Sequence, residues 1–286
     1  MIIPFEDLGG AGPLVHFAHA NGYPPGAYAP LLAPLTERYH VLAMAARPLW
    51  PAPVDGLTPA ALRDWTPFTT DLLGFLEARS PGGWIGMGHS LGAVNTLDAA
   101  LRRPELFRAL VLIDPVIFRR RFMWGWHLMK TLGVGDRVHP LIQGSLRRRR
   151  VFASADEMFS RYRRAPIFSR LTDASLRAYV DALARPRPDG RVELAFSPEW
   201  EAAIYRHGPL NLWARLPALR LPLLVIYGAE SDTFVPTVAR RLQRLLPHAR
   251  LVAVPDAGHL VPLEKPAEVA AAAAQFLEDQ LGLGAA

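Results

Sequence analysis

The chain has 286 residues, of which 50% are hydrophobic and 20% charged, a composition that suits one large α/β domain or one domain with an inserted piece. It contains no cysteine, which excludes a disulfide framework, a thiol nucleophile and a cysteine-based metal site. The N-terminus lacks the basic start and apolar core of a signal peptide, and no apolar run approaches the ~20 residues of a membrane span. We therefore expect a cytoplasmic protein.

The formal net charge is +6, and the basic excess lies in the middle of the chain, where residues 119–213 hold 18 basic and 9 acidic side chains. A solvated helix face is the default interpretation of such arginine runs. Attraction to anionic substrates, or peripheral contact with a membrane surface, is the alternative. Nucleic acid is not an expected partner, because aromatic residues do not alternate with the arginines and no recognition motif is present.

Apolar runs and helical spacing alternate along the chain. Strands are predicted over 14–18, 41–45, 84–85, 110–114, 222–227 and 250–254, and helices over 28–39, 59–78, 93–101, 235–246 and 266–281. Strands that are apolar throughout and alternate with helices indicate an α/β fold, with a mostly parallel sheet covered by helices on both faces.

The alternation stops between residues 118 and 215, where helical patterns are punctuated by proline and glycine and no convincing parallel strand appears. This segment is therefore predicted to be an insertion between two sheet strands. The core domain is then formed by residues 1–117 and 216–286.

A glycine-flanked serine stands where a predicted strand meets a predicted helix, in the run Gly86–Gly92. Gly88 and Gly92 lie two residues on either side of Ser90, which a tight strand-to-helix turn requires because side chains there would clash. Such a turn lifts the serine hydroxyl clear of the sheet, within reach of a base and of the first amides of the helix.

This pentapeptide is the G-x-S-x-G nucleophile elbow, and with its flanking strand and helix the chain resembles the α/β-hydrolase family. The resemblance implies that residues 118–215 form a helical cap and that an acid and a histidine follow the serine in chain order. By the family spacing, Asp232 is the orienting acid and His259 the general base, each in a loop after a buried strand.

Other interpretations of the residues around this triad stay open. Asp232 can instead cap the following helix, and Glu230 and Asp114 are alternative acids, although Asp114 is expected rather to help seat the cap. His19 and His89 are expected to pack or to form hydrogen bonds rather than to act directly.

The resemblance also implies an oxyanion hole made of backbone N–H groups. Leu91, directly after the nucleophile, is the expected first donor. Family members often carry His-Gly in the loop after the early strand, whereas this chain has His19-Ala20-Asn21-Gly22, so Asn21 is the expected second donor and Ala20 the alternative.

Apolar and aromatic residues near the expected site form a candidate substrate pocket, and they are Tyr23, Phe118, Phe122, Trp124, Phe234 and Leu260. Several of them can equally form the core of the cap. No metal-ligand spacing and no phosphate loop is evident, so neither a metal nor a cofactor is expected.

The expected function is a serine hydrolase that cleaves an ester-type bond of a small, largely apolar substrate through an acyl-enzyme. Thioesterase, lactonase, carbon–carbon bond hydrolase, acyltransferase and perhydrolase activities use the same triad and are alternatives. An alternative of another class is a non-catalytic ligand-binding protein that keeps the fold.

Overall fold

A mostly parallel seven-stranded sheet forms the centre of the computed structural model, which describes residues 3–51, 56–117, 125 and 139–282. Its order is β1-β3-β2-β4-β5-β9-β10, and only β1 runs antiparallel to its neighbour. The strands are β1 (Phe5–Gly9), β2 (Leu14–Ala18), β3 (His40–Met44), β4 (Trp84–His89), β5 (Phe107–Ile113), β9 (Leu223–Gly228) and β10 (Arg250–Val254).

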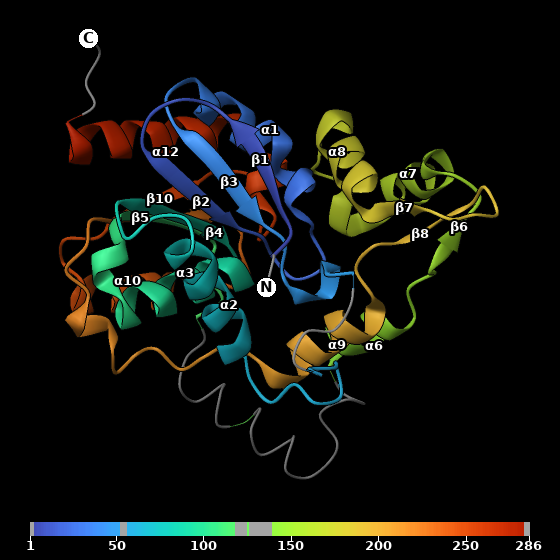
Figure 1. Cartoon of the computed structure of the whole chain (residues 1–286), viewed down its shortest axis with the longest axis horizontal. Coiled ribbons are helices and arrows are strands. Elements are labelled where there is room, and N and C mark those ends of the chain that lie inside the picture. Colours follow the sequence, from blue (N-terminus) through green and yellow to red (C-terminus); the bar gives the residue numbers. More distant parts are fainter. Residues whose placement is uncertain (1–2, 52–55, 118–124, 126–138, 283–286) are drawn as a thin grey trace.

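Helices cover both faces of this sheet (Figure 1), as the apolar strands predict. One face carries α1 (Ala29–Leu32) and α12 (Pro266–Leu281). The other carries α2 (Thr66–Glu77), α3 (Leu91–Arg102) and α10 (Pro236–Leu245). The α/β-hydrolase fold expected from the sequence is thus confirmed.

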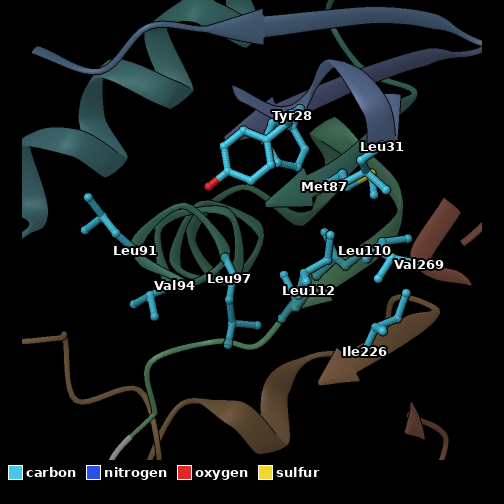
Figure 2. Close-up of a cluster of buried hydrophobic side chains, with 14 of the residues drawn as sticks. Tyr28, Leu31, Met87, Leu91, Val94, Leu97, Leu110, Leu112, Ile226 and Val269 are labelled. Atoms are coloured by element: carbon cyan, nitrogen blue, oxygen red, sulfur yellow. The ribbon is translucent and has the colours of Figure 1, made fainter. Parts of the chain in front are cut away.

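The central strands are buried on both sides. Every residue of β4 and all of β5 except Arg108 are buried. Leu110 and Leu112 of β5 lie in the same hydrophobic cluster as Val94 and Leu97 of α3 (Figure 2). This packing places the start of α3, directly after Ser90, against the middle of the sheet.

Two of the predicted helices are divided or shorter in the structure. Residues 28–39 form α1 between the 3₁₀ segments Pro25–Tyr28 and Ala33–Glu37 rather than one helix, since Pro30 and Pro34 each lack the amide that a continuous helix needs. The predicted helix over 59–78 begins only at Thr66, whose N–H donates to Asp64 Oδ1 at 2.7 Å.

The segment between β5 and β9 adds no strand to the central sheet in its described part. It contains the expected helices, α6 (Pro140–Leu146), α7 (Ala155–Arg163), α8 (Asp173–Leu183) and α9 (Pro198–His207). It also contains a small antiparallel sheet that was not predicted, of strands β6 (Val151–Phe152), β7 (Ala184–Pro186) and β8 (Val192–Leu194). These strands are too short to show a periodic pattern. We call residues 118–215 the cap segment.

Many arginines of the cap segment pair with carboxylates of the same segment. Four such pairs are Arg149–Glu157, Arg150–Glu199, Arg185–Glu193 and Arg191–Asp189. This pairing favours the solvated-face interpretation of the arginine runs. Within the described residues, no helix combines the length and the apolar character needed to cross a bilayer.

One buried histidine, His16 on β2, is a source of acid sensitivity. It is 1% exposed, its ring lies 5.3 Å from that of Phe75, and neither ring nitrogen has a hydrogen-bond partner among the described residues. Burial lowers the pKa of His16 to about 3. The imidazole is therefore neutral in the folded protein at every pH above that value.

We expect His16→Leu to remove part of the acid sensitivity of the fold. Below the pKa of about 6.5 that histidine has in an unfolded chain, the unfolded state binds a proton on His16 that the folded state does not. The free energy of unfolding therefore falls as the pH drops from about 6.5 toward 3. Relative to wild type, the variant should gain about 2 kcal/mol between pH 8 and pH 5 in urea denaturation. The exposed control His248→Gln should show no such gain, and an equal effect of His16→Leu at both pH values would contradict the prediction.

Candidate functional site

Ser90 stands in a strained turn between β4 and α3. Its φ of 56° and ψ of −114° lie in a region that L-residues rarely adopt, and its N–H donates to Ile113 O at 3.0 Å. The flanking glycines are sterically required. A Cβ on Gly92 would lie 2.0 Å from Ala18 O, and a Cβ on Gly88 would lie 2.7 Å from Gly92 C.

His259 lies beside the serine, in the loop after β10. Its Nε2 is 3.0 Å from Ser90 Oγ, and its Nδ1 is 2.8 Å from Asp114 Oδ1. A carboxylate only accepts hydrogen bonds, so Nδ1 carries the hydrogen and Nε2 is free to accept one from the serine hydroxyl. This is the arrangement that a general base needs to activate a serine.

The carboxylate that orients His259 is Asp114, at the end of β5, and not the predicted Asp232. Asp114 is fully buried, and it also accepts hydrogen bonds from Gly228 N at 3.0 Å and Ser231 Oγ at 2.7 Å. Together with His259, these donors satisfy a buried charge that would otherwise be costly. These contacts are to residues of the core, not to the cap segment that Asp114 was expected to help seat.

Asp232 lies on the rim of the site, and its assignment as the orienting acid is a prediction that the geometry contradicts. Its side chain is exposed and accepts a hydrogen bond from Thr233 Oγ1 at 3.1 Å. The physical reason is the turn after β9, which Ser231 N closes on Gly228 O at 3.0 Å. This turn directs Ser231 inward to Asp114 and the next side chain outward. Glu230, the other alternative acid, pairs with Arg170 of the cap segment.

A cavity of about 420 Å³ opens above Ser90 and His259, between the core and the cap segment. Of the predicted pocket residues, Tyr23 and Leu260 line it. Phe234 does not, because it is 1% exposed and its ring packs 5.1 Å from that of Tyr227. The other three predictions, Phe118, Phe122 and Trp124, fall outside the described residues.

Helix α9 contributes a wall of this cavity that the sequence did not reveal. Ile204 and Tyr205 line it, together with Trp65 of the core. Trp65 Nε1 donates to Ile204 O at 3.0 Å, and Asn21 Nδ2 donates to Glu201 O at 3.1 Å. Helical patterns over residues 118–215 predicted helices in this segment, but nothing in the sequence indicated which helix faces the serine.

The predicted oxyanion residues Leu91 and Asn21 both line the cavity, as does the alternative, Ala20. The N–H of Ala20 donates to the hydroxyl of Tyr28 at 3.2 Å, so that amide is already engaged. The histidines next to these loops form hydrogen bonds, as expected. His89 Nε2 lies 2.9 Å from His259 O, and His19 Nδ1 lies 2.8 Å from Ala20 O.

Comparison with known proteins finds a family model and relatives that the chain resembles. The model of the "Alpha/beta hydrolase family" matches residues 17–272. The chain is 26% identical over 274 residues to 2-(acetamidomethylene)succinate hydrolase of Mesorhizobium japonicum, covering 94% of this chain and 89% of the relative. It is 28% identical over 184 residues to pimeloyl-[acyl-carrier protein] methyl ester esterase of Nitrosomonas europaea, covering 63% and 66%. A crystal structure of E-2-(acetamidomethylene)succinate hydrolase superposes with a TM-score of 0.77 at 21% identity, covering 96% of this chain and 94% of that one.

The two candidate acids can be separated by matched substitutions that remove only the charge. We expect Asp114→Asn to slow fluorophosphonate labelling of Ser90 by about 10³–10⁴-fold, because an amide in place of the carboxylate favours the wrong tautomer of His259. Asp232→Asn, exposed on the rim, should label at the wild-type rate. Labelling would be followed by intact mass against time. A slow Asp232→Asn and a fast Asp114→Asn would reverse the assignment.

Proposed function

The chain belongs to the alpha/beta hydrolase family, and we propose that within it this protein is a serine hydrolase acting on an ester-type bond of a small, largely apolar substrate. The observation that carries the proposal is the continuous line of hydrogen-bonding contacts from Asp114 through His259 to Ser90 at the wall of a cavity. A strained serine, a base within 3.0 Å and an acid that orients the base are the components of nucleophilic acyl transfer.

In the proposed reaction, His259 Nε2 takes the proton of Ser90 as the serine oxygen attacks the substrate carbonyl carbon. The tetrahedral intermediate collapses when His259 returns that proton to the leaving alcohol, and an acyl-enzyme remains. Water then attacks the acyl carbon while His259 accepts its proton, and His259 returns that proton to Ser90 Oγ as the C–O bond to the serine breaks and the acid is released. Asp114 keeps the imidazole in one tautomer and stabilises its positive charge while it holds the proton.

The oxyanion of each intermediate is assigned to the backbone N–H groups of Leu91 and Asn21. Leu91 opens α3, where the unpaired amides and the helix dipole favour negative charge. In the other loop, Ala20 is the poorer candidate because its N–H donates to Tyr28. Asn21 is anchored by its side chain to Glu201 O, which supports a fixed position for its backbone.

The cavity supports a substrate with a substantial apolar part. Its apolar lining includes Trp65, Ile204, Tyr205 and Leu260, and Ile167 and Leu141 lie at exposed positions of its wall. Polar groups such as Arg170, Glu230 and Thr233 also line the cavity. The apolar side chains favour an acyl or alcohol group of low polarity where the substrate contacts them. The esterase relative from Nitrosomonas europaea is consistent with an ester bond as the target.

Hydrolysis of p-nitrophenyl esters with acyl chains of increasing length tests this proposal. We expect wild-type turnover, and at least a 10³-fold loss in Ser90→Ala, because the serine is the attacking group. The chain length of highest kcat/KM would measure the apolar room beside the serine. Asp232→Asn serves as a matched control that leaves the line of contacts intact and should keep wild-type turnover.

Two results would contradict the proposal. Equal turnover by wild type and Ser90→Ala would place the hydrolysis elsewhere. A folded wild type that neither turns over any ester nor reacts with a fluorophosphonate would favour a ligand-binding protein that keeps the fold.

A further inference from the structure

A buried chain of hydrogen bonds joins the loop that carries Asn21 to the loop that carries His259. The N–H of Ala20 donates to Tyr28 Oη at 3.2 Å, Tyr28 Oη lies 2.8 Å from His89 Nδ1, and His89 Nε2 lies 2.9 Å from the backbone oxygen of His259. Tyr28 and His89 are both 0% exposed. Neither takes part in the proposed reaction.

The donor and the acceptor of each hydrogen bond in this series follow from the backbone groups of His259 and Ala20 at its two ends. The backbone oxygen of His259 can only accept, so His89 Nε2 carries the hydrogen. Nδ1 of the neutral ring must then accept, and the donor is the Tyr28 hydroxyl. The hydroxyl oxygen is left to accept from Ala20 N–H. Burial holds the pKa of His89 well below its usual value, so the neutral ring that this order needs is maintained.

The other polar group of Ala20 is held in a similar way. His19 Nε2 accepts from Ala46 N at 2.9 Å, so its Nδ1 carries the hydrogen and donates to Ala20 O at 2.8 Å. Burial lowers the pKa of His19 to about 4, which keeps this ring neutral as well. The N–H and the C=O of Ala20 are thus both fixed by buried side chains, one residue before the proposed oxyanion donor.

We propose that Tyr28 and His89 are positioning residues that set the distance between the oxyanion loop and the general base. The inference rests on the proposed function, because it assigns to Asn21 and His259 the roles given there. The Tyr28 ring lies in the hydrophobic cluster among Leu31 and Met87 (Figure 2), so the aromatic body is fixed by packing while its hydroxyl serves the two loops.

Loss of the Tyr28 hydroxyl is expected to lower the turnover rate and to leave substrate binding largely unchanged. Without the Tyr28 hydroxyl, the buried N–H of Ala20 loses its acceptor and His89 Nδ1 loses its donor. The loop can then rotate to use Ala20 N–H elsewhere, and Asn21 N–H moves relative to the oxyanion. Displacements of about 1 Å at a reacting centre reduce rates by about 10²-fold, whereas the walls that bind substrate stay in place.

Tyr28→Phe tests this role, with Tyr39→Phe as the matched control. Tyr39 is 1% exposed, and its hydroxyl makes no hydrogen bond to any described residue. We expect Tyr28→Phe to lower kcat on a p-nitrophenyl ester at least tenfold with KM within about twofold, and to slow fluorophosphonate labelling of Ser90 by a similar factor. Tyr39→Phe should match wild type in both. Equal labelling rates for the two variants would overturn the inference.

A second pair of variants examines His89 in the same assays. Gln at this position can still donate to the His259 carbonyl, whereas Leu cannot. We expect His89→Gln to label at least tenfold faster than His89→Leu, with all rates measured well below the lowest melting temperature of the set. Wild-type labelling by His89→Leu would show that the bond to His259 O positions nothing.

The labelling assay also separates this inference from the proposed function. A wild type that does not react with the fluorophosphonate contradicts the serine-hydrolase proposal itself. A wild type that reacts, with Tyr28→Phe equally fast, leaves that proposal standing and removes only the positioning role of Tyr28.

Discussion

The contact between Asp114 and His259 is the constraint on which the site depends. The two residues are 145 positions apart in sequence and stand after β5 and β10, with β9 between those strands in the sheet. The same carboxylate accepts hydrogen bonds from Gly228 N and Ser231 Oγ, both in or after β9. One buried charge therefore ties together the carboxyl ends of three neighbouring strands, and its desolvation is offset only while all three stay in register.

Features with a local physical cause could be predicted from the sequence. The central strands β4 and β5 are buried on both faces, so their positions are marked by their apolar composition. The elbow around Ser90 needs small residues at two fixed offsets, and Gly88 and Gly92 stand there. His259 follows from its place after the mostly apolar run that forms β10. In each case the backbone geometry of a few adjacent residues decides the outcome.

The direction in which a side chain points in the loop after a strand could not be predicted from the sequence. Asp114 and Asp232 both follow buried strands, and spacing alone does not show that the turn at Gly228–Ser231 sends the latter to the surface. The sequence predicts one irregular helix over residues 28–39, whereas the structure has short helical segments there. The hydroxyl of Tyr28 contacts His89 of the elbow, which the sequence did not indicate. Edge strand β1 is antiparallel and has no buried residue, so it lacks the continuous apolar run of the central strands.

The core is bonded to α9, which forms a wall of the cavity, through backbone oxygens of that helix. Trp65 and Asn21 donate to the carbonyl oxygens of Ile204 and Glu201, groups that every amino acid possesses. Substitution of Ile204 or Tyr205 on α9 can therefore reshape the space above Ser90 without removing either anchor. A helix attached in this way allows proteins that diverge from one ancestor to differ in the substrates they accept, while the reacting groups beneath the helix stay unchanged.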